Sequence, residues 1–203
     1  MPDNNARVTK NLVIINVIVF LATLLNEPFM MQNFALYYPM SHNFHWWQIF
    51  THMFMHGNFW HIFFNMYTLY MFGTVVEQII GGRKFLIYYF VCGLGAVALH
   101  LGVQALQAHF FFSSIPPVVG ASGAIYGILI AFAMLFPEAR MTLIFPPVSM
   151  KAKTMVIVFA AIELFTGVTG IADGIAHFAH LGGMLFGWLL IKYWRKRGTL
   201  FDR

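Results

Sequence analysis

The chain is built from long apolar stretches divided by short polar breaks. Each stretch is close to the roughly 20 residues that an α-helix needs to cross a ~30 Å hydrocarbon core. We expect the first stretch to stay on the protein as a helix, because no small-x-small cleavage site follows it before the bulky segment 28–38. The pattern therefore predicts an all-α membrane protein, one domain over residues 1–203, with six membrane-spanning helices at about 11–26, 59–78, 85–107, 120–137, 154–172 and 174–194.

Composition supports a membrane protein and excludes a water-soluble globule. Hydrophobic residues make up 60% and charged residues 9% of the chain, and its mean hydropathy is +0.72. A soluble chain has about 45–50% apolar and 25% charged residues. The formal net charge of +5 does not indicate a nucleic-acid partner, because the basic residues form no continuous patch.

The basic residues predict the orientation of the helices in the bilayer. If the N-terminus is cytoplasmic, every Lys and Arg falls on the cytoplasmic side and no outer loop carries a positive charge. We therefore expect both termini to be cytoplasmic, with the inner side carrying Arg7, Lys10, Arg83, Lys84, Arg140, Lys151, Lys153, Lys192, Arg195, Lys196, Arg197 and Arg203.

The segment between the first two predicted helices, residues 27–58, is long and rich in aromatic side chains. Amphipathic rings are favoured where a membrane meets water, so this outer loop is predicted to lie in the interface. An ordinary aromatic belt explains the same composition, and both interpretations stay open. The rings are Phe34, Tyr37, Tyr38, Phe44, Trp46, Trp47, Phe50 and Phe54.

Polar side chains inside the predicted spans are informative, because an unpaired polar group in hydrocarbon costs several kcal/mol. His61 and Asn65 share one face of the second span near its outer end, and Ser122 opens the fourth span at the same side. His180 lies about 9 Å into the sixth span from outside. The predicted topology thus places polar groups of three helices at the same depth in the membrane.

Small residues indicate that two of these helices touch. Gly123, Gly127 and Ala131 follow one another at steps of four after Ser122, and Gly183 and Gly187 follow His180. Such small-xxx-small faces let helix backbones approach closely, which would bring the Ser122 hydroxyl to the His180 imidazole. The alternative is that the glycines only pack helices and that Ser122 caps the fourth one.

This arrangement would support nucleophilic acyl transfer. A serine hydroxyl needs a neighbouring base, and neutral imidazole suits that role, so we expect Ser122 to attack and His180 to act as base and then as acid. The backbone amides of Ala121 and Ser122 at a helix start, aided by the side chains of His61 and Asn65, would form an oxyanion hole.

This reasoning puts no acidic residue close enough to His180 to complete a catalytic triad. Asp173 precedes His180 by seven residues, about 10 Å along a helix axis and too far for a hydrogen bond. Glu163 lies in the middle of the fifth span and is expected to be deeper, as a structural partner or part of a gate. We therefore predict a Ser–His dyad, with Tyr126 either stacked on His180 or simply packed in the core.

With these residues in place, the chain resembles the rhomboid family of intramembrane serine proteases. The matching motifs are WQIFTHMFMH from Trp47, HIFFN from His61, GASG from Gly120 with Tyr126 following, and AHLGGMLFG from Ala179. The resemblance implies a six-helix core of the compact bacterial type in a cell membrane, the bacterial inner membrane. Catalysis would rest on Ser122 and His180, with supporting positions at Gly120, Gly123, Tyr126, Gly183 and Gly187.

The resemblance also implies cleavage of single-span membrane substrates near their outer ends, with no cofactor and no metal. Gln48 departs from the family pattern, because many bacterial relatives carry Arg after the tryptophan; this leaves open how the outer loop is anchored. Hydrolysis requires water, so the polar residues of the outer loop and second span are expected to line a hydrated cavity. Substrate would enter sideways from lipid, with the fifth span and outer loop as the moving parts.

Two function classes compete with this interpretation. A haem-bearing electron carrier could use buried histidines such as His100 and His109, although glycine-closed helix faces leave little room for a macrocycle. A transporter lined by the same polar groups is the second alternative, but apart from the Pro146–Pro147 loop the chain shows no repeat or broken helix. A zinc protease of the HExxH type is disfavoured because that motif does not occur.

Overall fold

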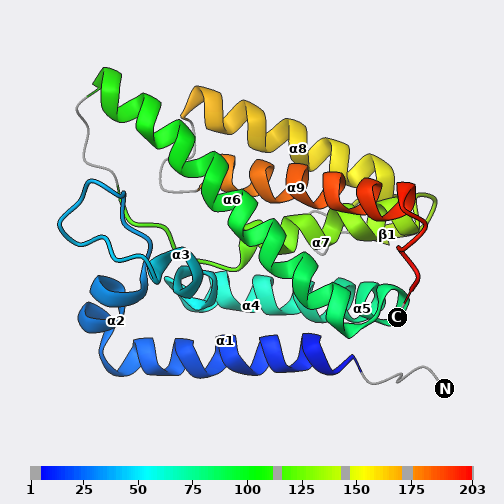
Figure 1. The fold of residues 1–203 in the computed structure, drawn as a ribbon, viewed down its shortest axis with the longest axis horizontal. Helices are drawn as coiled ribbons and strands as arrows, with labels where there is room; N and C mark the ends of the chain where they lie inside the picture. Colours follow the sequence, from blue (N-terminus) through cyan, green and yellow to red (C-terminus); the bar gives the residue numbers. More distant parts are fainter. Residues whose placement is uncertain (1–5, 112–115, 143–146, 171–175, 203) are drawn as a thin grey trace.

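The computed structural model describes residues 6–111, 116–142, 147–170 and 176–202, and these are mostly helical (Figure 1). The long helices are α1 (Arg7–Leu25), α6 (Gly82–Phe111), α7 (Ser122–Leu135), α8 (Ala152–Thr169) and α9 (His177–Lys196). The second predicted span is made of α4 (Phe59–Thr68), the π-helical turn η2 (Leu69–Gly73) and α5 (Thr74–Ile80). The segment between α1 and α4 holds α2 (Glu27–Phe34), α3 (Gln48–Thr51) and the 3-10 turn η1 (His52–Phe54).

Several of these helices have the length and composition of membrane spans. Within the described residues, α1, the Gly82–Leu106 part of α6, and α8 are long and apolar enough to cross a bilayer, and α7 is a shorter apolar helix. Many large apolar side chains of α1 and α8 face outward rather than into the protein, among them Ile18, Leu21, Leu24, Ile157, Phe165 and Val168. Such surfaces are stable in lipid and not in water. The chain is therefore a helical membrane protein.

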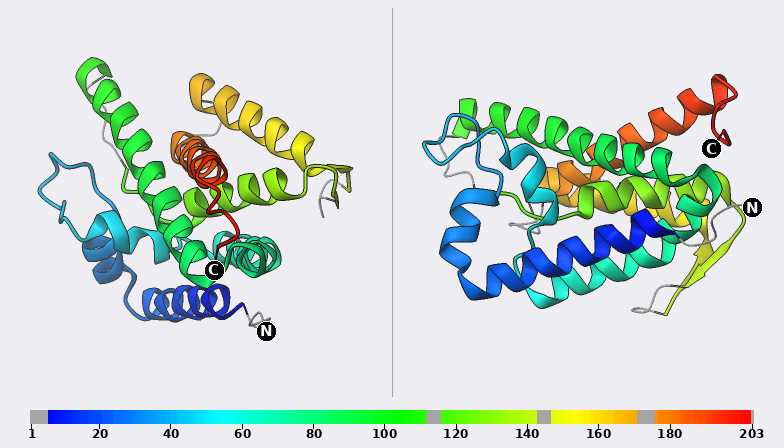
Figure 2. Two further views of the ribbon diagram at one scale, coloured as in Figure 1. Left: turned by 45° about the vertical axis from the view of Figure 1, so that its right-hand side comes forward. Right: turned by 60° about the horizontal axis from the view of Figure 1, so that its bottom comes forward.

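The helices match the predicted spans to within a few residues, with two corrections. The fifth and sixth predicted spans were expected to end at 172 and begin at 174, positions that lie outside the described residues; α8 ends at Thr169 and α9 begins at His177. The all-α expectation is also incomplete, because β1 (Arg140–Thr142) and β2 (Ser149–Lys151) form a short antiparallel pair beyond the end of α7 (Figure 2).

The segments that carry the basic residues lie at one end of the molecule. The start of α1, the turn between α5 and α6, the β1–β2 pair and the end of α9 lie at the right in Figure 1, and α2 and α3 at the left. Contacts at the basic end tie these segments together. The Lys84 ammonium donates to the carbonyls of Thr199 and Asp202, and Arg195 donates to the Met134 carbonyl at 2.6 Å.

The core of the protein is the contact between α6, α7 and α9, and glycines allow it. A Cβ added to Gly183 of α9 would lie 1.8 Å from the carbonyl oxygen of Gly123 on α7. A Cβ on Gly127 would lie 2.4 Å from the Cys92 sulfur, and one on Gly187 2.4 Å from the Tyr88 hydroxyl. The expected close approach of the two glycine faces is thus present in the structure, with the backbones in direct contact.

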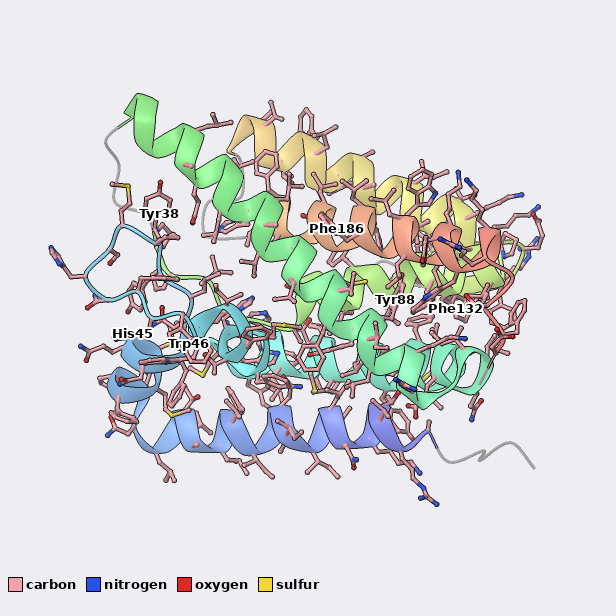
Figure 3. All side chains as sticks on the ribbon, viewed as in Figure 1. Tyr38, His45, Trp46, Tyr88, Phe132 and Phe186 are labelled. Carbon is pink, nitrogen blue, oxygen red and sulfur yellow. The ribbon has the colours of Figure 1, made fainter. Side chains whose placement is uncertain are left out.

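Gln48 anchors the segment between α1 and α4. Its side chain is fully buried. Its amide Nε2 donates to the carbonyl of Asn43 at 2.9 Å and its Oε1 accepts from the amide of His45 at 3.1 Å, which closes the loop that bears His45 and Trp46 (Figure 3). It also approaches the carbonyls of Gln32 and Asn33 at the end of α2. A neutral amide therefore anchors this loop, which answers the question that Gln48 left open.

Glu77 holds α1 against the second span. Its carboxylate accepts hydrogen bonds from the backbone amides of Val8 and Thr9, at 3.0 and 2.7 Å, and from the Thr9 hydroxyl at 2.7 Å. The first amides of a helix have no partner within it, and a carboxylate there also interacts favourably with the helix dipole. The buried charge on α5 thus caps the N-terminus of α1.

Candidate active site

Ser122 and His180 meet at the centre of the helical core. Ser122 is the first residue of α7, and His180 lies in the first turn of α9. The direct contact between Gly123, the residue after Ser122, and Gly183, one turn after His180, brings the side chains together. Nε2 of His180 lies 2.8 Å from Oγ of Ser122, within hydrogen-bonding distance. His180 is buried, with 8% of its surface exposed.

Gly120 brings a third helix to the same point. Its φ of +128° is strained for residues with a side chain. A Cβ at this position would lie 2.8 Å from Nε2 of His61 on α4 and 3.6 Å from Oγ of Ser122. The Gly120 amide donates to the His52 carbonyl at 2.9 Å, which fixes the loop before α7. Glycine is therefore required both for the backbone conformation and for the space between His61 and Ser122.

The remaining predicted oxyanion donors also lie at this end of the helices. Asn65 is one turn after His61 on α4 and is buried, and its Nδ2 has no hydrogen-bond partner among the described residues. Ala121 precedes the first residue of α7, and amides at the start of a helix have no partner within it. Buried donors without a partner are costly unless a ligand or reacting group accepts from them.

Two buried histidines of the outer segment, His52 and His56, border the site. His56 packs edge-on against the His61 ring, with 4.9 Å between ring centroids. Burial, reinforced by the neighbouring His61, lowers the pKa of His56 from 6.5 to about 3, and burial lowers the pKa of His52 to about 4. Both rings are therefore neutral near pH 7.

Tyr126 stacks on His180, which was one of its two predicted positions. The ring centroids are 4.3 Å apart and the planes differ by 10°. Tyr126 lies one turn after Ser122 on α7, so the same helix supplies the hydroxyl and the aromatic surface that holds the imidazole plane.

Glu163 lies at the site, and the expectation that no acidic residue reaches His180 is wrong. Its Oε1 is 3.0 Å from Nδ1 of His180 and accepts a 2.5 Å hydrogen bond from the Tyr126 hydroxyl. Glu163 lies six residues before the end of α8 and His180 three residues after the start of α9, a difference of about 4.5 Å along a helix axis that the glutamate side chain spans. Asp173, the other acidic residue considered, lies outside the described residues.

His177 is a residue of the site that the sequence-based prediction did not include. Its Nδ1 lies 2.6 Å from Oε2 of Glu163 and 3.1 Å from Oγ1 of Thr166. The available signal was its spacing, because residues three apart, such as His177 and His180, share one helix face.

Glu163, His177 and His180 also form a group that could be considered as metal ligands, with one ligand atom from each within 4.8 Å of the others. The nitrogens of His177 and His180 are 2.6 and 3.0 Å from the carboxylate oxygens. Ligands of a tetrahedral zinc with bonds of about 2.0–2.1 Å lie about 3.3 Å apart. The shorter separations suit shared protons better than a shared metal. Of the two histidines considered for haem, His109 has its side chain outside the described residues.

Comparison with known proteins gives a family match over most of the chain. Residues 43–197 match the model of the Rhomboid domain, a range that includes Ser122, His180, His61 and Asn65. Rhomboid protein 1, mitochondrial, of Saccharomyces cerevisiae is 31% identical over 144 residues, which cover 68% of this chain and 40% of that protein. Presenilin-associated rhomboid-like protein, mitochondrial, of Rattus norvegicus is 31% identical over 153 residues, covering 72% and 39%.

A bacterial relative is similar to the same extent. Rhomboid protease GluP of Bacillus subtilis is 31% identical over 142 residues, which cover 70% of this chain and 25% of that protein. The chain thus spans at most about two fifths of the length of these three relatives. The domain match covers most of the chain, and the chain therefore belongs to the rhomboid family.

Proposed function

We propose that this protein is an intramembrane serine endopeptidase, which hydrolyses peptide bonds in or near the transmembrane segments of membrane proteins. The observation that carries the proposal is the 2.8 Å contact between the Ser122 hydroxyl and the His180 imidazole, made by two helices inside the core. Ser122 attacks the carbonyl carbon while its proton moves to Nε2 of His180. His180 then gives that proton to the leaving amine, and water repeats the sequence to release the acyl group.

The oxyanion formed in each step is held by donors from two helices. The Ser122 and Ala121 amides lie at the start of α7, where the helix dipole favours negative charge. His61 contributes its ring from across Gly120, and Asn65 contributes the unpaired Nδ2. No cofactor enters this mechanism, since the chain's own side chains supply nucleophile, base and charge stabilisation.

The protein crosses the membrane six times in this proposal, with both termini in the cytoplasm and the outer segment in the interface. Support comes from the fold, because segments bearing the basic residues share one end of the molecule. The positive-inside tendency supports a cytoplasmic location for that end. The membrane in this proposal is the bacterial inner membrane, as the resemblance to the compact bacterial type implies.

Substrates are single-span membrane proteins that enter sideways from the lipid past α8. This helix lies at the edge of the bundle, and its described surface exposes Ile157, Ile162, Leu164, Phe165 and Val168. A disulfide cross-link that joins α8 to α4 is expected to abolish cleavage. Full activity in the cross-linked protein would exclude this entry route.

A fluorophosphonate probe tests the nucleophile directly. Purified protein in detergent is expected to be labelled on Ser122, and both Ser122→Ala and His180→Ala should prevent labelling. Ser149→Ala removes an exposed hydroxyl on β2 and should leave labelling unchanged. If labelling survives Ser122→Ala, Ser122 is not the nucleophile and the proposal fails.

A further inference from the structure

Glu163 is a buried carboxylate on a helix that otherwise faces outward. Its exposed fraction is 6%, whereas its neighbours Ile162 and Leu164 are 52% and 53% exposed. An acidic residue in a membrane span is costly unless other polar groups compensate its charge. The buried Glu163 carboxylate therefore needs polar partners in the structure.

Those partners come from the two helices that carry the proposed catalytic pair. Oε2 of Glu163 lies 2.6 Å from Nδ1 of His177, and Oε1 accepts from the Tyr126 hydroxyl at 2.5 Å. Oε1 is also 3.0 Å from Nδ1 of His180. The carboxylate is thus held between α7 and α9, with one oxygen at the ring nitrogen that Ser122 does not use.

The tautomer of His180 follows from the Ser122 contact. To receive the serine proton, Nε2 must carry a lone pair, so in the neutral ring the hydrogen resides on Nδ1. That N–H is not aligned for a regular hydrogen bond in the resting structure. An anion 3.0 Å away nevertheless attracts a positive ring, because the coulombic interaction depends on distance more than on alignment.

We propose that Glu163 is a positioning residue of the active site, which acts through Nδ1 of His180 and turns the Ser–His pair into a Ser–His–Glu triad. This inference rests on the proposed function. When the Ser122 proton moves to Nε2, the ring becomes an imidazolium, and the Glu163 carboxylate stabilises that charge while it stays ionised. The proton then leaves from Nε2 to the departing amine, so Glu163 neither gains nor loses a proton.

Tyr126 and His177 hold the Glu163 carboxylate in position. Tyr126 contacts both members of the pair, since its hydroxyl donates to Glu163 and its ring stacks on His180. His177 contacts the other carboxylate oxygen and Thr166 of the same helix as Glu163. The imidazole plane and the carboxylate are therefore fixed relative to each other by side chains of three helices.

The experiment compares Glu163→Gln, Glu163→Asp and the control Glu27→Gln, an exposed carboxylate on α2. Cleavage of a transmembrane model substrate in proteoliposomes gives kcat and KM. Exhaustive fluorophosphonate labelling counts the competent Ser122 sites, so that kcat is expressed per site. An effect on folding lowers the number of sites, whereas loss of charge stabilisation lowers the rate at each site.

Glu163→Gln is expected to lower kcat per site by about 10²- to 10³-fold with KM nearly unchanged. This is less than the roughly 10⁴-fold loss for an amide in an aligned soluble triad, because the resting N–H is not aligned. Glu163→Asp keeps the charge but withdraws it from the ring, and should lower kcat by about 10-fold or more. Glu27→Gln should match the unaltered protein.

An unchanged kcat per site in Glu163→Gln overturns the triad and leaves the Ser122–His180 mechanism intact. If Glu163→Gln yields no labelled sites, Glu163→Asp is the deciding variant. An unchanged kcat per site in Glu163→Asp also overturns the triad. Failure of the proposed function is a different result, namely cleavage that persists in Ser122→Ala.

Discussion

Substitution of Gly183 by alanine should separate the catalytic pair without touching either member. The added Cβ would lie 1.8 Å from the Gly123 carbonyl oxygen, and Cβ atoms essentially never approach other atoms closer than 3.0 Å. The contacting atom belongs to backbone, so rotation of a side chain cannot relieve the clash. Helices α7 and α9 must move apart by about 1.2 Å to reach even that minimum.

The catalytic consequence follows from where the clash lies. Gly123 is next to Ser122, and Gly183 is one turn from His180. A separation of that size would lengthen the 2.8 Å contact between Oγ and Nε2 to about 4 Å, beyond hydrogen-bonding distance. We expect about a 10²-fold loss of kcat, the effect typical of a 1 Å misplacement, and about 1–3 kcal/mol of destabilisation from overpacking.

The assay measures the rate of fluorophosphonate labelling and the thermal unfolding midpoint in the same detergent. Gly102→Ala is the matched control, because a Cβ on this α6 glycine meets nothing within 4 Å. It should leave the labelling rate unchanged and slightly raise the midpoint, as alanine favours a helix. Normal labelling in folded Gly183→Ala would refute the argument that backbone contact sets the Ser122–His180 distance.

Three further predictions concern the outer segment and the oxyanion site. Gln48→Ala should lower the free energy of unfolding by about 1–3 kcal/mol in a denaturant titration, because two partly buried hydrogen bonds to the backbone are lost; equal stability would show that the loop is anchored elsewhere. His56 should make the fold acid-sensitive: its pKa is about 3 when folded and 6.5 ordinarily, so below pH 6.5 only the unfolded chain gains this proton. The free energy of unfolding should therefore fall by up to about 1.4 kcal/mol for each pH unit down to pH 3. Unfolding midpoints measured across this pH range should fall less in His56→Phe than in the unaltered protein. Asn65→Ala should lower kcat by about 10²- to 10³-fold, and a normal kcat would remove Asn65 from the oxyanion hole.

The parts of the site that were predictable are those set by helix order and depth. Ser122 and His180 could be placed together because span length and charge distribution assign each a level, and their glycine faces indicate contact. The position of Tyr126 over His180 was one of the two that its spacing of four residues from Ser122 allowed. These features depend on local periodicity, which a single sequence contains.

The missed features depend on where helices stop and on side-chain reach. Glu163 meets His180 through the reach of its side chain, and the helix ends that set the depth of both residues are poorly marked by apolar runs. Helix α2 could have been found, since Asn26 accepts from the Phe29 amide as an N-cap and Pro28 stands in the first turn. The π turn of the second span could not, because an apolar run such as LYMFG looks the same in either helix type.

That π turn lets one membrane helix serve two separate neighbours. A π turn inserts one residue relative to a regular α-helix, and each residue of an α-helix rotates the following face by about 100°. The half before it, α4, directs His61 to Ser122, whereas the half after it, α5, directs Glu77 to the first amides of α1. Winding the same residues as a regular α-helix would leave one half in register and swing the other a quarter-turn or so away, uncoupling the first helix from the proposed hydrolytic centre without altering any side chain in either place.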